Sequence, residues 1–206
     1  MNKSILTGLL SLTVATAGFS APQSYDFKDP KGVNAIQFHL DSLLEPISGT
    51  ANGVTGTVTF DAAKPEATTG KITVTSSSLV VSNATMTEHL HGKGWLDSAA
   101  NPEIVFELTS LSNVKNTGTA VSATANGKFT LKGVTKDISV PVTITHLAGK
   151  YGARLNKPDL KGDLLVVRGE FLIKRGDYGL QPGKNEERVN PEIKLSLAIV
   201  GSAPQA

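Results

Sequence analysis

The sequence predicts an all-β fold, an antiparallel β-barrel of about eight strands with a short helical plug over one end. Apolar and polar residues alternate with the spacing of half-buried strands through most of the 206 residues. The stretch Met86–Phe106 departs from that spacing, and no segment has the pattern of a long helix. A two-sheet sandwich would satisfy the same alternation. The barrel is preferred because closure removes exposed sheet edges.

Strands are expected where branched or aromatic residues alternate with polar ones. The clearest case is Val54–Phe60, where valine and phenylalanine alternate with threonine. The other expected strands, in chain order, are Ile36–Leu40, Ile72–Val74 continuing past a serine kink to Val81, Ile104–Leu108, Val121–Leu131, Ile138–Ile144, Leu165–Ile173 and Ile193–Ile199. Pro141 lacks the backbone donor that a sheet ladder uses, which predicts an edge or a bulge at that position.

Segments rich in glycine, proline and polar residues are expected to connect these strands. They are an irregular lead-in at 21–32, a Gly-, Ser- and Pro-rich segment at 41–53, a loop at 62–70, a turn at 113–118, and long loops at 148–163 and 175–191. Residues 201–206 are expected to fray. In the plug, Ser82 or Asn83 is expected to cap a short helix that runs through Leu90 and ends at Gly92.

The N-terminus has the pattern of a secretory signal. Lys3 gives the positive start, and Ile5–Ala15 is an apolar run followed by small residues. That run is too short to span about 30 Å of hydrocarbon as an anchor. We therefore expect residues 1–20 to be a cleaved signal peptide, with the cut after Ala17 or Ser20. The mature protein is then expected to be exported.

Composition excludes several classes of protein. Hydrophobic residues make up 39% of the chain and charged residues 18%, which suits a packed domain rather than a disordered one. The net charge is +2 and the lysines are scattered, so no nucleic-acid-binding surface is expected. The 0 cysteines exclude a disulfide, a thiolate metal site and a lipid-modified cysteine.

The histidines are the first candidates for chemistry. His89 and His91 would share a face on a strand but not on a helix. Two imidazoles make a weak metal site, and a third ligand would have to come from Glu88, Glu103 or a distant residue. No metal or other cofactor is therefore expected. His39 and His146 lie inside strand patterns and are expected to point outward or to cap a rim.

The chain shows no assembled catalytic set. It has no Gly-x-Ser-x-Gly turn for a nucleophile and no glycine-rich phosphate loop. Glu186 and Glu187 lie beside Lys184 and Arg188, which is typical of a solvated charge cluster rather than an acid–base pair.

Arg175 and Asp177 are more informative, because they follow the end of an expected strand. They predict either a salt bridge of low energetic value at the barrel rim or a charged rim near a ligand headgroup.

Three segments carry a resemblance to a known family. The first joins His89-Leu90, Trp95-Leu96-Asp97, Asn101-Pro102 and Phe106; the second is the strand-turn-strand element Gly127–Lys136; the third is Ile173–Leu180. In this order they resemble the YceI-like family, with Trp95 where a phenylalanine is usual and Asn101 where a tyrosine is common. The resemblance covers nearly the whole mature chain, and the domain is expected to span residues 33–201.

The resemblance implies a binding protein and not an enzyme. Members of the family are similar to lipocalins, with an extended barrel whose apolar tunnel holds polyisoprenoids or other long-chain amphiphiles in the bacterial periplasm. They need no metal, and no catalytic residue defines them. The expected ligand-binding residues are then Phe38, Phe60, Leu90, Trp95, Phe106, Phe129, Val140, Phe171 and Arg175.

The expected partners are a long-chain isoprenoid or fatty amphiphile and, transiently, the membrane that supplies it. Whether the chain forms a homodimer stays open. Two other functions also stay open: a metal-dependent enzyme that uses the His89/His91 loop, and an interaction module whose barrel is filled by its own side chains.

Overall fold

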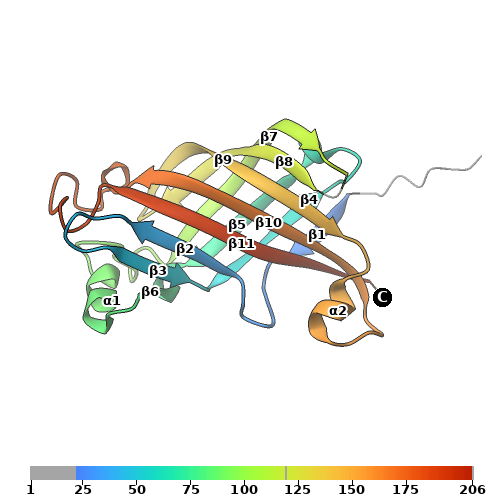
Figure 1. Cartoon of the computed structure of the whole chain (residues 1–206), viewed down its shortest axis with the longest axis horizontal. Helices are drawn as coiled ribbons and strands as arrows, with labels where there is room; N and C mark the ends of the chain where they lie inside the picture. Colours follow the sequence, from blue (N-terminus) through green and yellow to red (C-terminus); the bar gives the residue numbers. More distant parts are fainter. Residues whose placement is uncertain (1–21, 119, 206) are drawn as a thin grey trace, which may run out of the picture.

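The computed structural model describes residues 22–118 and 120–205, most of which lie in antiparallel strands (Figure 1). The expected signal peptide, residues 1–20, lies outside the described residues. The strands are β1 (Gln23–Asp26), β2 (Ala35–Leu40), β3 (Ile47–Ala51), β4 (Val54–Phe60), β5 (Thr69–Thr75), β6 (Leu79–Val81), β7 (Glu103–Asn116), β8 (Val121–Leu131), β9 (Val134–Leu147), β10 (Lys161–Lys174) and β11 (Glu192–Gln205).

Helical segments are short in this part of the chain. The α-helices are α1 (Ala84–His91) and α2 (Tyr151–Leu155), and the 3-10 turns are η1 (Pro65–Ala67), η2 (Ser76–Ser78) and η3 (Arg175–Tyr178). No helix among the described residues is long and apolar enough to span a bilayer.

All these strands belong to one antiparallel sheet that closes on itself. The ring runs β1-β4-β5-β7-β8-β9-β10-β11, and Asp26 of β1 pairs with Ser202 of β11 to complete it. β2 continues the line of β1 along β11, β3 pairs with β2, and β6 pairs with β3. If β1 with β2, β3 with β4, and β5 with β6 are each counted as one interrupted strand, the described wall has eight long strands. The predicted antiparallel barrel is confirmed.

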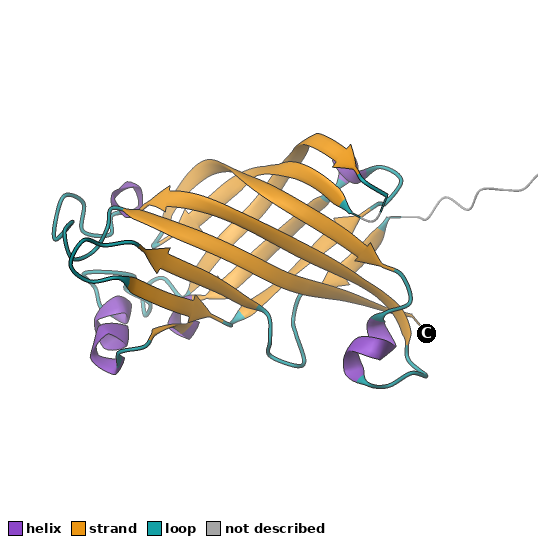
Figure 2. Cartoon of the chain, viewed as in Figure 1, coloured by secondary structure: helices purple, strands orange, loops and turns teal. Residues whose placement is uncertain are grey.

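The two ends of the barrel differ (Figure 2). The end that carries the connections 61–68, 117–120 and 148–160, with α2 in the last of these, is called the closed end below. The opposite end carries the connections 41–46, 82–102, 132–133 and 175–191, and α1 lies on the second of these. It is called the mouth end.

The ladder between β9 and β10 covers only the closed half of these strands, all of whose residues are described. It runs from Leu147 opposite Leu164 to Val142 opposite Gly169, and it stops beside Pro141. β9 continues to pair with β8 beyond that point, to Val134. The predicted edge at Pro141 is therefore confirmed, because the proline cannot donate to a ladder.

The interruption between β1 and β2 is held together by side chains. Asn34 is buried, and its amide nitrogen donates to the carbonyls of Phe27 (3.1 Å) and Val200 (3.0 Å). Its amide oxygen accepts from the backbone nitrogen of Val200 at 2.9 Å. One side chain thus takes the place of ladder bonds where the strand leaves the sheet.

The predicted plug helix is confirmed. Asn83 caps α1, its side-chain oxygen accepting from the backbone nitrogen of Met86 at 2.9 Å, and the helix ends at Gly92. The chain then returns to the barrel, where the backbone nitrogen of Ser76 donates to Pro102 at 2.8 Å. The buried hydroxyl of Ser76 also lies 2.9 Å from that of Ser98. The plug is therefore fixed to the bend between β5 and β6.

Several boundary expectations were wrong. The lead-in at 21–32 contains β1, and the segment 41–53 contains β3. These strands are short and show little alternation, but each has a partner strand on both sides that supplies its hydrogen bonds.

Strands also extend further into polar segments than expected. The expected turn at 113–118 is strand up to Asn116, and the tail expected to fray pairs with β10 as far as Gln205. The expected loop at 148–163 contains α2, and β10 already begins at Lys161.

Candidate ligand-binding cavity

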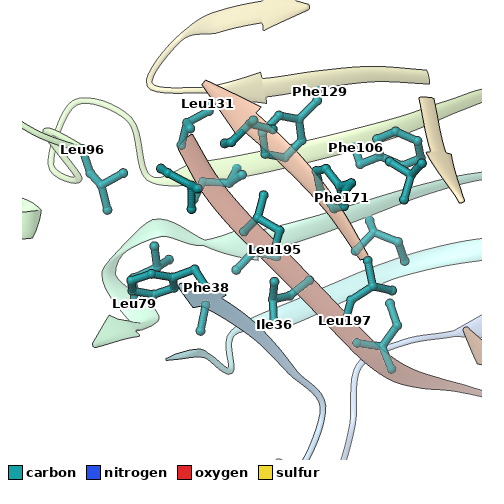
Figure 3. A pocket seen from close by; sticks show the side chains of 18 of the residues that line it. Ile36, Phe38, Leu79, Leu96, Phe106, Phe129, Leu131, Phe171, Leu195 and Leu197 are labelled. Atoms are coloured by element: carbon teal, nitrogen blue, oxygen red, sulfur yellow. The ribbon is translucent and has the colours of Figure 1, made fainter. Parts of the chain in front are cut away.

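The barrel encloses a cavity of about 400 Å³ that is lined almost entirely by apolar side chains. Figure 3 shows Ile36, Phe38, Phe171 and Leu195, among others, directed into one shared space. The volume falls in the range of pockets that hold small ligands. The interior is therefore not filled by the protein's own side chains.

Strand alternation places the lining. In β8, the alternate residues Val121, Ala123, Ala125, Gly127, Phe129 and Leu131 are buried, whereas the residues of opposite parity are less so. Successive side chains of a strand point to opposite faces of the sheet, so this parity directs one set inward. The same rule places the lining residues that β9, β10 and β11 contribute. In β7 a register shift between Leu108 and Ser110 brings Leu111 to the inner face.

Two glycines give space to aromatic rings of the lining. A Cβ at Gly49 would lie 2.1 Å from the ring of Phe38, and one at Gly127 would lie 2.7 Å from the ring of Phe106. Any side chain at either position would displace a ring from the cavity wall. The glycines in β3 and β8 are therefore part of the cavity's construction.

The closed end of the cavity is sealed by packed side chains. Phe27, Leu111, Leu165 and Ile199 line it there, and all four are buried. Nearby Tyr25, 1% exposed, donates its hydroxyl to Gln23 at 2.9 Å. Burial raises the pKa of Tyr25 to about 12, and the charge of Asp163 adds to that effect.

The cavity opens at the mouth end. Among its lining residues, Glu45 and His89 are the two classed as exposed. Glu45 lies in the 41–46 connection and His89 on α1, so the opening lies between these segments. The Glu45 carboxylate is 3.8 Å from the Nε of Arg188.

Arg175 lines the cavity beneath the 175–191 connection, and it is 1% exposed. Its guanidinium donates to the carbonyls of Leu180 (2.7 Å) and Val189 (3.0 Å). It donates as well to those of Gln181, Lys184 and Asn190. Burial lowers the pKa of Arg175, and the charge of Glu186 opposes that shift.

The rim salt bridge expected for Arg175 is wrong, whereas its position near a ligand headgroup stays a prediction. None of the ion pairs between described residues joins Arg175 to Asp177. The Arg175 side chain points into the protein because the loop that follows it folds back and offers its carbonyls. Its Cζ also lies 5.7 Å from the centre of the Trp95 ring, within the range of a cation–π contact.

A small apolar cluster lies under the plug. Its buried members are Leu96, Phe129, Leu131, Ile173, Tyr178 and Leu180. The ring of Phe129 meets Phe171 and Tyr178 edge to face, at centroid distances of 6.1 Å and 5.6 Å. This cluster joins the plug, the β8–β9 hairpin and the 175–191 connection around the mouth.

Eight of the expected ligand-binding residues line the cavity: Phe38, Leu90, Trp95, Phe106, Phe129, Val140, Phe171 and Arg175. Phe60 does not. It is buried at the end of β4, opposite Gln23, in the packed core of the closed half. That the eight contact a ligand stays a prediction.

The histidines do not form a metal site in the described part of the chain. His91 accepts or donates a hydrogen bond with Ser98 at 3.0 Å, and His89 lies at the mouth. Nowhere among the described residues do three potential metal-ligating side chains of His, Cys, Asp or Glu type gather.

The two remaining histidines lie on strands. His39 is exposed beside Ser48, as expected. His146 is partly buried, 3.2 Å from the carboxylate of Asp163.

Sequence reasoning missed several lining residues. Ile72, Leu195 and Leu197 belong to the alternating runs, so parity was sufficient to find them. Glu45 and Val189 lie in irregular connections that have no periodic signal. They reach the cavity only because their loops fold over the barrel.

Comparisons with known proteins agree with this architecture. A model of the family described as "YceI-like domain" matches residues 29–201. The "UPF0312 protein" of Pseudomonas savastanoi pv. phaseolicola is 34% identical over 202 residues, which cover 95% of this chain and 96% of that protein.

Two solved structures share the fold. BcnA of Burkholderia cenocepacia is 21% identical, with a TM-score of 0.66 over 81% of this chain and 95% of that one. A "polyisoprenoid binding domain" from Saccharophagus degradans is 12% identical, with a TM-score of 0.63 over 88% of this chain and 99% of that one.

Proposed function

Since this chain belongs to the YceI-like family, we propose that it binds a long-chain isoprenoid or another long-chain amphiphile inside its barrel. The observation that carries the proposal is the cavity of about 400 Å³ with an almost wholly apolar lining. Its exposed polar residues, Glu45 and His89, lie at the mouth. An apolar tail would lie inside and a polar headgroup would remain at the mouth. The name of the Saccharophagus degradans domain supports this ligand class.

Energetics favour a carrier over a permanent store. Burial gains about 0.8 kcal/mol per CH₂ taken from water. A membrane offers the same tail a similar apolar environment, so the net preference for the cavity is small. The protein would therefore exchange its ligand with a membrane, and contacts at the mouth would decide which headgroup it prefers. Ordering the chain reduces the gain further.

The expected signal peptide supports an exported carrier, working in the periplasm or outside the cell. We propose binding rather than catalysis as its activity. Arg175, the buried charged residue of the lining, already donates to loop carbonyls. The carrier needs no cofactor.

The test is solvent extraction of the purified full chain followed by mass spectrometry. We expect one apolar or amphiphilic molecule per chain. The same protein, stripped of ligand, should take up a polyprenol and a long-chain fatty acid. Recovery of clean protein that takes up neither would refute the proposal. Expression in a second host separates a selected ligand from whichever lipid is most abundant.

A further inference from the structure

Two adjacent leucines project from the mouth of the cavity. Leu43 is 79% exposed and Leu44 is 58% exposed, and both lie in the 41–46 connection between β2 and β3. On either side of the pair, Leu40 and Glu45 line the cavity. Figure 1 shows this connection at the same end as α1 and the 175–191 connection. The exposed pair is therefore continuous with the opening of the cavity.

The connection is held in place. The backbone nitrogen of Leu44 donates to Glu187 at 2.9 Å. The buried hydroxyl of Ser42 accepts from the backbone nitrogen of Asn190 at 2.9 Å, and the Asn190 amide donates to Asp41 at 2.7 Å. These bonds fix the backbone on both sides of Leu43. The leucines thus face solvent on an ordered loop, and little ordering entropy remains to be lost when they bind.

The charges around the pair are mixed. Lys184 and Arg188 lie beside Glu186 and Glu187 in the neighbouring connection, and Arg188 lies near Glu45. Such an arrangement gives no strong attraction to an anionic surface, in contrast to a polybasic patch. A surface that receives the leucines would be held by their burial in an apolar layer.

We propose that Leu43 and Leu44 insert into a lipid bilayer and bring the cavity mouth against it. This inference rests on the proposed function, because a ligand with a long apolar tail resides in a membrane and crosses water poorly. A mouth seated on the bilayer surface lets the tail pass between two apolar environments. The leucines occupy the acyl boundary, and the polar residues of the rim stay at headgroup level.

The test measures binding of the full chain to neutral phosphatidylcholine vesicles by co-flotation. The test variant is Leu43→Ser/Leu44→Ser. The control is Val33→Ser/Leu160→Ser, which removes residues 62% and 40% exposed that lie outside the mouth connections. We expect vesicle binding to fall at least about tenfold in the test variant, since each buried leucine contributes one to two powers of ten. The control should bind like the unmodified chain, and tenfold higher salt should change little.

A second measurement distinguishes membrane docking by the leucines from ligand binding in the cavity. Binding of parinaric acid, a fluorescent long-chain fatty acid added from water, reports the cavity without a membrane. We expect it to be unchanged in the test variant, and this also shows that the variant is folded. Equal vesicle binding by test variant and unmodified chain would overturn docking by the leucines, as would no vesicle binding by either. Loss of binding at high salt would overturn it too. Failure of parinaric acid to bind the unmodified chain would instead count against the proposed function.

Discussion

The closed and mouth ends of this barrel are built from the same strands but satisfy their backbones differently. Toward the closed end, β1 joins β4 to β11, and β9 pairs with β10. Toward the mouth, the β9–β10 ladder stops at Pro141, and the plug lies between β6 and β7. Loop hydrogen bonds and the buried Arg175 organise that end instead.

The closed end and the mouth end therefore have different roles: one stabilises the barrel, and the other gives access to the cavity. Packed side chains seal one end, where β1 joins β4 to β11 through the pair Asp26–Ser202 and β9 pairs with β10. The other end leaves the apolar interior reachable, and it needs side chains to hold its loops. We infer that the closed end supplies most of the barrel's rigidity, whereas the mouth determines what enters.

Replacing Arg175 tests the mouth end most severely. Arg175→Met should lower the free energy of unfolding by about 3 kcal/mol or more, because several carbonyls lose a charged donor. Arg175→Lys should restore less than half of that loss, since one ammonium cannot reproduce a planar fork of donors. Urea denaturation measures both variants. A methionine variant as stable as the unmodified chain would show that the 175–191 connection keeps its fold without the guanidinium of Arg175.

A pair of alanines on one strand locates the border between cavity and core. Ala123 and Ala125 are both buried on the inner face of β8, but only Ala125 lines the cavity. Ala123→Leu should destabilise by about 1–3 kcal/mol through overpacking.

Ala125→Leu should cost less than Ala123→Leu, because the added atoms enter empty space, and it should select ligands with shorter tails. Denaturation and mass spectrometry of extracted ligand measure these effects. Equal destabilisation of the two variants would mean that no such border lies between them.

Alkaline pH should weaken the closed end. The pKa of Tyr25 is raised from 10.0 to about 12. Both folded and unfolded chains carry a neutral tyrosine below pH 10, so this contribution is complete there. It is lost as pH rises from 10 toward 12, by about 1 kcal/mol at pH 11. Denaturation midpoints across this range should show a slope that Tyr25→Phe reduces. An identical slope in the variant would assign the effect to other groups.

The smallest expected effect is at the plug. Trp95→Phe should destabilise by about 0.5–1 kcal/mol, because the smaller ring weakens the cation–π contact with Arg175. Trp95 is the single tryptophan of the chain, so emission from the unmodified protein reports this site alone. Because the ring lines the cavity, its emission should shift or be quenched on ligand uptake. Unchanged emission, with uptake shown independently, would place Trp95 away from the ligand.

The sequence by itself determined the long strands and their inward faces. Two-residue alternation directs one face of each long strand inward, and that pattern is local, so the strands and most of the lining could be predicted. A barrel was preferred over a sandwich because closure removes exposed sheet edges. The capping side chain of Asn83 and the break at Gly92 likewise set the limits of α1 within a few residues. The missing donor of Pro141 marked where a ladder ends.

Only the tertiary structure decided how the sheet closes, where the cavity opens and how the charge of Arg175 is buried. β1 and β3 are strands because neighbours pair with them on both sides, which no short window of sequence records. Arg175 is buried because the 175–191 connection that follows it folds back and offers its carbonyls. The mouth arises where Glu45 and His89, from separate connections, meet the same cavity. The width of the cavity depends on how far apart the closed wall holds opposite strands. That distance follows from the whole ring and not from any one strand within it.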